Sequence, residues 1–280
     1  MARETTPRPE RSHAPPGTRL LTLGASPRRG DLLGPTHATS AELPLYTGSL
    51  EFRTDGQIVE NVEIRTDQGL YVPADRVTFR NVRIVFTGAL DSDFTMVNLN
   101  YNSGTVFQDC ELDGRGNVPR AITGSGVTVR NCHLHHVGNA IETDTPMRVE
   151  GNYIHDVFEA EGTGWHADGI QAPESSRGVT IRHNTILARD PATSAIMVTG
   201  TSANPARDVL IQHNLLGGGG YTLYAGPGSN YRVIENHFTT RVFPKVGYWN
   251  IWYWEPSRDG DVTRSGNVIH ETGAPANGNL

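Results

Sequence analysis

One short phrase decides the fold: VTVRNCHL (127–134) returns as MRVEGNYI (147–154) and VTIRHNTI (179–186). In each copy apolar residues alternate with polar ones, and a polar turn precedes a last apolar residue. This is the period-2 pattern of short strands with one buried face. The other copies are QIVENVEI (57–64), VTFRNVRI (77–84), TVFQDCEL (105–112), VLIQHNLL (209–216), YRVIENHF (231–238) and VTRSGNVI (262–269).

The spacing of the copies indicates how the strands are arranged. Successive copies lie 20 to 32 residues apart, which fits one coil of about three short strands with corner loops of variable length. We therefore predict an all-β fold, a single-stranded right-handed parallel β-helix of about nine coils. A leucine-rich repeat lacks its LxxLxL phrase here, and a propeller blade would need about 40 residues.

The sixth position of the phrase forms a column along the rod. It is occupied by Val62, Val82, Cys110, Cys132, Asn152, Asn184, Asn214, Asn236 and Asn267. Parallel coils stack like residues at about 4.8 Å, so the five asparagines should form a hydrogen-bonded ladder. We expect them to adopt the left-handed backbone of a tight corner. The two cysteines should be buried rungs, because parallel Cβ vectors suit a disulfide poorly; a disulfide or metal pair is the alternative.

A second column follows the loops. Its inward residues should be Ile122, Ile141, Ile170, Ile196, Leu223 and Ile251. The residue after each should point outward, which gives the row Thr123, Glu142, Gln171, Met197, Tyr224 and Trp252. This predicts one external face that changes from polar to aromatic along the rod.

Composition sets the boundaries and excludes some partners. The chain has 280 residues and a net charge of -6, which argues against nucleic acid, and no apolar run is long enough for a membrane span. We predict a Pro/Arg-rich extended arm over 1–46, a β-helix over 47–273 and a loose C-terminal tail over 274–280. No signal peptide is predicted, since no apolar region follows the early charges.

The densest polar cluster lies on three adjacent coils. His135-His136 and His155-Asp156 follow the same repeat position, so they should stack one coil apart. The insertion 155–168 adds further polar residues, and the adjoining face begins nearby. The predicted catalytic residues are Glu142, His155, Asp156, His166 and Asp168, with Arg120 and Gln171 as binding residues.

The chemistry of this cluster stays open at the sequence level. A hydrolase would use Asp168 and Glu142 as its carboxylate pair, helped by His166 or His155. A lyase would take Arg120 as its base. A metal site would use His155, Asp156, His166 and Asp168, but no fixed ligand spacing is present, so no cofactor is predicted, and Ca²⁺ lacks a specific motif. As a structural alternative, these side chains cap backbone groups at the corners.

A second candidate surface is aromatic. WNIWYW (249–254) contains Trp249, Trp252 and Trp254, and with Tyr224 and Tyr248 they could form a platform on which sugar rings stack. Alternation places Trp252 and Trp254 outward. The alternative is a hydrophobic cap over the last coil or an oligomer contact.

The phrases resemble the pectate-lyase-like superfamily of right-handed β-helix proteins, and more narrowly β-helix proteins of actinobacteria and their phages. The matching stretches cover roughly residues 48–240: TDGQIVENVEI, RVTFRNVRI, NYIHDV followed by GWHADGIQ, VTIRHNTI, and NLLGGGGYTLYAG. The resemblance implies the fold, and a range of roles: polysaccharide lyase, glycoside hydrolase, epimerase or non-catalytic phage tail part. The lone lysine, Lys245, lies outside the polar patch, and the paired-Asp and Gly-His-Gly phrases of polygalacturonase-like hydrolases are absent.

Three functional hypotheses follow. The first is a phage virion component, in the tail or on the surface, that binds cell-surface polysaccharide and in one version cleaves it. Its residues 1–46 would dock on a larger protein assembly, and a homotrimer is one arrangement that the resemblance allows. The alternatives are a secreted bacterial polysaccharide lyase or glycoside hydrolase, and a non-catalytic decoration protein.

Overall fold

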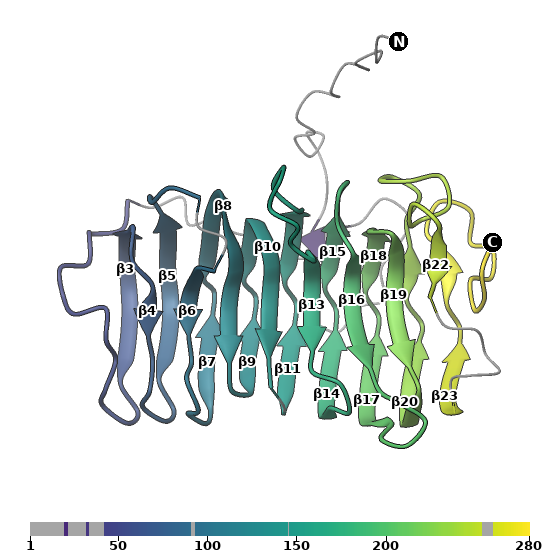
Figure 1. Cartoon of the computed structure of the whole chain (residues 1–280), viewed down its shortest axis with the longest axis horizontal. Helices are drawn as coiled ribbons and strands as arrows, with labels where there is room; N and C mark the ends of the chain where they lie inside the picture. Colours follow the sequence, from purple (N-terminus) through teal and green to yellow (C-terminus); the bar gives the residue numbers. More distant parts are fainter. Residues whose placement is uncertain (1–19, 22–31, 34–41, 91–92, 145, 254–259) are drawn as a thin grey trace, which may run out of the picture.

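The protein is a rod of stacked coils (Figure 1). The computed structural model describes residues 20–21, 32–33, 42–90, 93–144, 146–253 and 260–280. Within these residues 22 strands form one continuous sheet, in which every pairing between strands is parallel. Each coil contributes strands to three faces, so the structure is the predicted parallel β-helix.

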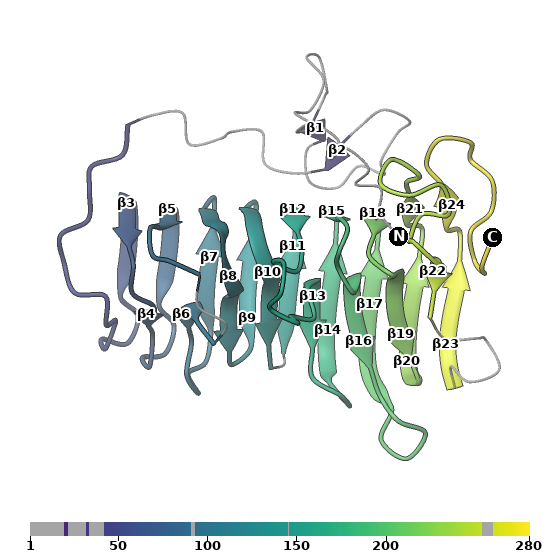
Figure 2. The same cartoon turned by 45° about the horizontal axis from the view of Figure 1, so that its top comes forward.

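The strands divide among the faces by their pairing partners, and Figure 2 labels strands of all three faces. The first face contains β3 (Ile58–Thr66), β5 (Thr78–Phe86), β8 (Glu111–Gly124), β10 (His133–Thr143), β12 (Tyr153–Val157), β15 (Thr185–Ala188), β18 (Leu215–Gly218), β21 (His237–Phe238) and β24 (Val268–Ile269). The second face contains β4 (Leu70–Tyr71), β6 (Thr95–Asn98), β13 (Asp168–Ala172), β16 (Ser194–Thr199), β19 (Tyr221–Gly226) and β22 (Asn250–Trp252), with the later parts of β8 and β10.

The third face carries the first half of each repeated phrase. It contains β7 (Thr105–Gln108), β9 (Val127–Arg130), β11 (Met147–Glu150), β14 (Arg177–Arg182), β17 (Ala206–Gln212), β20 (Gly228–Ile234) and β23 (Gly260–Ser265), with the first halves of β3 and β5. A separate pair, β1 (Leu20–Leu21) and β2 (Leu32–Leu33), lies within the predicted arm. None of the residues described above forms a helix long and apolar enough to cross a membrane.

Apolar side chains fill the inside of the rod as the alternation predicts. Ile122, Ile141 and Ile170 pair in register on successive coils, and all three are fully buried. Aromatic residues also stack: the ring centroids of Phe79 and Phe107 lie 4.9 Å apart. Stacking of like residues keeps each coil aligned with the next, which fixes the positions of the outward side chains as well.

The asparagine ladder forms as predicted. The side-chain amide of Asn184 donates to Oδ1 of Asn214 at 2.9 Å and to the carbonyl of Val149 at 3.0 Å. The same pattern links Asn152 to Asn184, Asn214 to Asn236, and Asn236 to Asn267. Cys110 and Cys132 are free, buried thiols that continue the column, with the Cys110 N–H 3.4 Å from Sγ of Cys132.

The left-handed backbone lies one residue before the position we predicted. In all nine copies of the phrase the fifth residue has a positive φ, between 52° and 68°: Asn61, Asn81, Asp109, Asn131, Gly151, His183, His213, Glu235 and Gly266. The chain turns at this residue so that the following side chain can point inward to the ladder. The prediction for the ladder asparagines was therefore wrong by one position.

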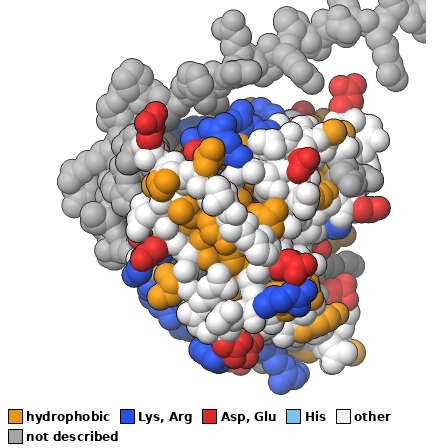
Figure 3. All heavy atoms as spheres, turned by 90° about the vertical axis from the view of Figure 1, so that its left-hand side faces the viewer, with side chains coloured by type: hydrophobic (Ala, Val, Ile, Leu, Met, Phe, Trp, Pro, Cys, Tyr) orange, Lys and Arg blue, Asp and Glu red, His pale blue; other side chains and the backbone are white. Residues whose placement is uncertain are grey.

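The N-terminal end of the rod exposes hydrophobic side chains. At the end shown in Figure 3, hydrophobic side chains gather near the centre with charged ones around them. Leu45 and Ile58, in the first coils, are exposed, and Leu45 forms an isolated parallel β-bridge with Glu63 of β3.

At the other end the C-terminal residues are not loose, so that prediction was wrong. Asn277 accepts from the Asn267 amide at 3.0 Å and adds a rung to the ladder. Asn279 accepts from the Trp252 N–H at 2.9 Å, and Ala276 is buried. The tail therefore closes the last coil.

Candidate functional site

The outward row of the second face passes over a hollow. Register places Asn98, Thr123, Glu142 and Gln171 in one line on successive coils. They line a cavity of about 420 Å³, together with residues of the adjoining corner that include Tyr101 and Asp144. Most residues that line the hollow have polar side chains, and they include the predicted carboxylate Glu142.

Asn139 organises the row from beneath. Its amide nitrogen donates to Glu142 Oε2 at 2.7 Å and to Gln171 Oε1 at 2.9 Å, and its Oδ1 accepts from the Asp168 N–H at 2.7 Å. One buried side chain thus holds Glu142, Gln171 and the start of β13 in a fixed arrangement.

Asp168 is wholly buried beside this network. Ser194 Oγ donates to its Oδ1, while its Oδ2 has no hydrogen-bond partner among the described residues. Burial, with a further contribution from the nearby Glu142 charge, raises the pKa of Asp168 to about 7. Its carboxyl therefore changes protonation near neutral pH, although it lies beneath the surface.

Two other predicted residues, Arg120 and His166, are not among the residues that line the hollow. Arg120 donates from Nη2 to the Asp93 carbonyl at 2.9 Å, at the same register position as Asn139. His166 is exposed on the segment before β13.

An exposed aromatic cluster continues the second face toward the C-terminus. Tyr224 follows Met197 in the same outward row, and its ring stacks on Tyr253 with centroids 4.4 Å apart. Tyr221 joins both Tyr253 and Trp249, at 5.4 and 5.3 Å. Trp249 is 55% exposed and Tyr253 45%.

Main-chain contacts hold Trp249 in place. The Trp249 N–H donates to the Gly220 carbonyl at 2.8 Å, and a Cβ at Gly220 would lie 2.6 Å from the indole ring. Gly220 therefore permits the close approach of the ring to the backbone. Burial, with a contribution from Asp168, raises the pKa of Tyr224 to about 12, so the cluster lies within electrostatic range of Asp168.

Trp252 does not belong to this surface, and its predicted outward orientation was wrong. It pairs with Leu223, is 1% exposed, and packs on Phe238 at 5.6 Å between centroids. Tyr253 takes the outward place instead. Tyr248 is exposed beside Trp249, at 5.9 Å between centroids, and Trp254 lies outside the described residues.

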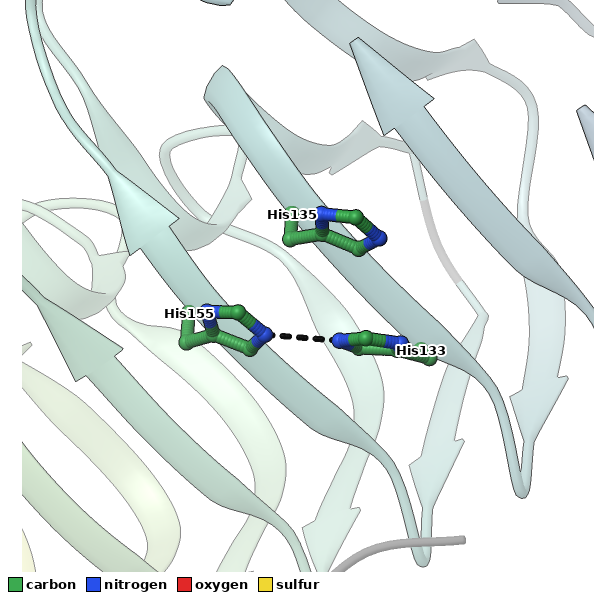
Figure 4. Close-up of side chains that lie close together, drawn as sticks. All are labelled: His133, His135 and His155. Atoms are coloured by element: carbon green, nitrogen blue, oxygen red, sulfur yellow. Dashed lines mark hydrogen bonds between the residues drawn. The ribbon is translucent and has the colours of Figure 1, made fainter. Parts of the chain in front are cut away.

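Histidines gather on the first face, one corner away from the hollow. His135 pairs in register with His155, and their ring planes are 4° apart, as the predicted stacking requires. Nε2 of His133 lies 2.6 Å from Nε2 of His155, and the His133 and His135 rings stack at 4.1 Å. Figure 4 shows the three rings together.

Carboxylates surround these rings. Asp156 Oδ2 lies 2.7 Å from His155 Nδ1, Glu111 Oε1 lies 3.3 Å from His135 Nε2, and Asp113 Oδ1 lies 3.0 Å from His136 Nδ1. The hydrogen bond to His155 is the largest contribution that holds the pKa of Asp156 at about 2. Burial and the neighbouring imidazoles lower the pKa of His133 to about 3. Burial also lowers the pKa of His155.

The structure thus divides the predicted catalytic cluster between two faces. Glu142, Asp168 and Gln171 come together on the second face, and His155 and Asp156 lie on the first. Sequence reasoning missed Asn139, His133 and Glu111. An alignment of the coils would have revealed His133, because HLHH (133–136) lies above YIHD (153–156) in the register of the repeat.

Comparison with known proteins agrees with this architecture. The family model for a right-handed β-helix region matches residues 60–240. No curated protein and no solved structure matches the chain. The matched region contains the hollow, the histidine cluster and most of the coils, and the chain belongs to the family of right-handed β-helix proteins.

Proposed function

We propose that the protein binds a cell-surface polysaccharide along its second face. The observation that carries the proposal is the outward row itself, which runs from the polar hollow at Glu142 and Gln171 to the stacked rings of Tyr224 and Tyr253. Sugars offer hydroxyl groups to amides and carboxylates, and C–H faces to aromatic rings. A linear glycan lying along the rod would meet both kinds of contact in turn.

The polar end of this surface is prepared for hydroxyl groups. Asn139 holds Glu142 and Gln171 at 2.7 and 2.9 Å, which limits the rotamers of both side chains before any ligand arrives. Preorganised groups lose less entropy on binding. Glu142 Oε1 and the Gln171 amide nitrogen remain as an acceptor and a donor for the ligand.

Cleavage is the second candidate function, and one observation favours it. Burial, with a further contribution from the Glu142 charge, raises the pKa of Asp168 to about 7, and the acid of a glycosidase also has a raised pKa. Asp168 is fully buried, so cleavage requires a movement of the chain that exposes its carboxyl.

We further propose the biological setting that the sequence suggests. The polysaccharide would belong to a bacterial surface, and the rod would act within a virion, held through residues 1–46, with secretion as the alternative. Light scattering of the purified chain tests the homotrimer, which predicts three times the mass of one chain.

The test is a panel of capsular and cell-wall polysaccharides, with retention measured by affinity electrophoresis. We expect Trp249→Ala and Tyr253→Ala each to weaken retention by about fivefold, since a stacking contact is worth about 1 kcal/mol. Arg148→Ala, an exposed change on the third face, is the control. New reducing ends, or ultraviolet absorbance from unsaturated products, that disappear in Glu142→Gln would add cleavage. A folded wild-type chain that retains no glycan would leave the decoration role.

A further inference from the structure

The histidine cluster of the first face has the composition of a transition-metal site. His133 and His135 come from β10 and His155 from β12, the next coil. Each ring offers a nitrogen atom, and the three nitrogens lie within 4.8 Å of one another. Imidazole is a preferred ligand of zinc, copper and nickel ions, whereas Ca²⁺ selects oxygen ligands.

Two ring nitrogens that lie 2.6 Å apart cannot both present a lone pair. A hydrogen atom or a metal ion must therefore lie between Nε2 of His133 and Nε2 of His155. Asp156 forms an ion pair with Arg189, whose Nη1 lies 3.2 Å from Oδ1, so its carboxylate can only accept hydrogen bonds. The hydrogen atom of His155 therefore lies on Nδ1, which faces Asp156 Oδ2 at 2.7 Å. Nε2 of His155 consequently presents a lone pair toward Nε2 of His133, 2.6 Å away.

The carboxylates lie where they do in known metal sites, beside the ring nitrogens of the histidines. A histidine that binds a metal commonly donates its other ring N–H to a carboxylate, which fixes the tautomer and the ring. Asp156 does this for His155. Asp156 and His136 both have left-handed backbones, φ 50° and 54°, at irregular points of the strand pairing. Such bulges redirect side chains, and here both stay beside the stacked rings.

We propose that His133, His135 and His155 together bind one divalent transition-metal ion of the zinc type on the first face, with Asp156 orienting His155. Two nitrogens on one zinc ion at about 2.0–2.1 Å lie about 3.3 Å apart, so the His133 and His155 rings must separate slightly. His135 must rotate from its stacked position so that one nitrogen turns toward the ion. Three protein ligands leave the fourth position of a tetrahedral ion to water or to Glu111, whose Oε1 is already 3.3 Å from His135 Nε2.

The test uses the full chain, freed of metal with EDTA and then titrated with ZnCl₂ by calorimetry and with CoCl₂ by visible absorption. We expect one ion per chain, and the intense absorption of tetrahedral nitrogen-ligated Co²⁺. His133→Gln and His155→Gln should each weaken zinc binding more than 100-fold, and Asp156→Asn about 10–100-fold. His237→Gln is the matched control, because His237 lies on the same face beside His270, with Nδ1 atoms 3.1 Å apart.

Two outcomes would overturn the proposal: a wild-type chain that binds neither ion, or binding that His133→Gln and His155→Gln leave at the wild-type level. Circular dichroism checks that the variants fold. If they do not, imidazole ¹⁵N spectra of the wild-type chain decide, because zinc must shift the ring nitrogens of His133, His135 and His155. Glycan retention should be unchanged by His133→Gln, so this test stands apart from that of the second face.

Discussion

At the scale of single residues, burial changes what a polar side chain does. Asp168 and Asp156 are both aspartates next to an apolar interior, yet their pKa values are about 7 and about 2. Asp168 is desolvated beside another carboxylate, while Asp156 faces His155 and Arg189. The sequence predicted that both would be functional, but it could not predict this difference, which depends on contacts made across coils.

The raised pKa of Asp168 makes stability depend on pH. The folded state holds the Asp168 proton up to about pH 7, whereas the unfolded chain releases it near pH 4, so the folded state binds more protons in between. The contribution of Asp168 to the free energy of unfolding therefore falls as pH rises from about 4 to about 7, by a few kcal/mol. Urea unfolding from pH 4 to 8 should show this loss in the wild type relative to Asp168→Asn. Parallel pH profiles would contradict the assignment.

The ladder makes a second prediction at this scale. Asn214 is buried and bonds with both neighbouring rungs and with the carbonyl of Ile181. Asn214→Ala leaves those partners unsatisfied, and each buried polar group without a hydrogen bond costs about 1–3 kcal/mol. We expect a loss of roughly 3 kcal/mol in the free energy of unfolding, measured with urea. Asn204→Ala, on an exposed loop, should change it by less than about 0.5 kcal/mol.

At the scale of strands and corners, the repeat made the fold predictable. Nine copies of one phrase specify which residues point inward, so the columns through Ile122 and Asn184 could be assigned in advance. The prediction failed at Trp252, where the irregular segment 239–249 carries no copy of the phrase. Without a copy of the phrase, the sequence did not determine the register of β22 to better than one residue. A shift of one residue moves each side chain of a strand to the opposite face.

The left-handed corner residue can be tested directly. Asn131 has φ 53°, a conformation that costs a β-branched residue about 1–2 kcal/mol and glycine nothing. Asn131→Val should lower the melting temperature, while Asn131→Gly should leave it equal or raise it. The opposite order of the two variants would show that the corner does not need this conformation in solution.

At the scale of the whole molecule, the rod is a sequence of neighbouring coils, each stabilised by the coils on either side. The comparison with the family and the parallel sheet agree on this architecture. The functional faces follow from it, because a row of outward side chains one coil apart is fixed by the inward rows. Residue types on those rows are independent of the fold, which explains why the repeat predicted the rod well and its chemistry less well.

The C-terminal residues contribute to the stability of the entire rod. Truncation after Gly273 removes the rung of Asn277, uncovers Trp252 and frees its N–H. We expect the melting temperature to fall by several degrees, with near-ultraviolet circular dichroism reporting the loss of Trp252 packing. Asn277→Ala alone should give a smaller part of the same decrease. A truncated chain that melts like the full chain would mean that the last coil needs no cover.

The closed end has a consequence for growth into filaments. A free edge of parallel strands is a template on which another chain can add, and fibrils elongate in this way. Here Pro275 forms an antiparallel bridge with Val268, and the Ile269 N–H donates to the Ala274 carbonyl. Because the last residues return in the opposite direction, they use hydrogen-bonding groups of β24 that would otherwise accept a new coil. The tail thus blocks the edge of β24 against the addition of another strand.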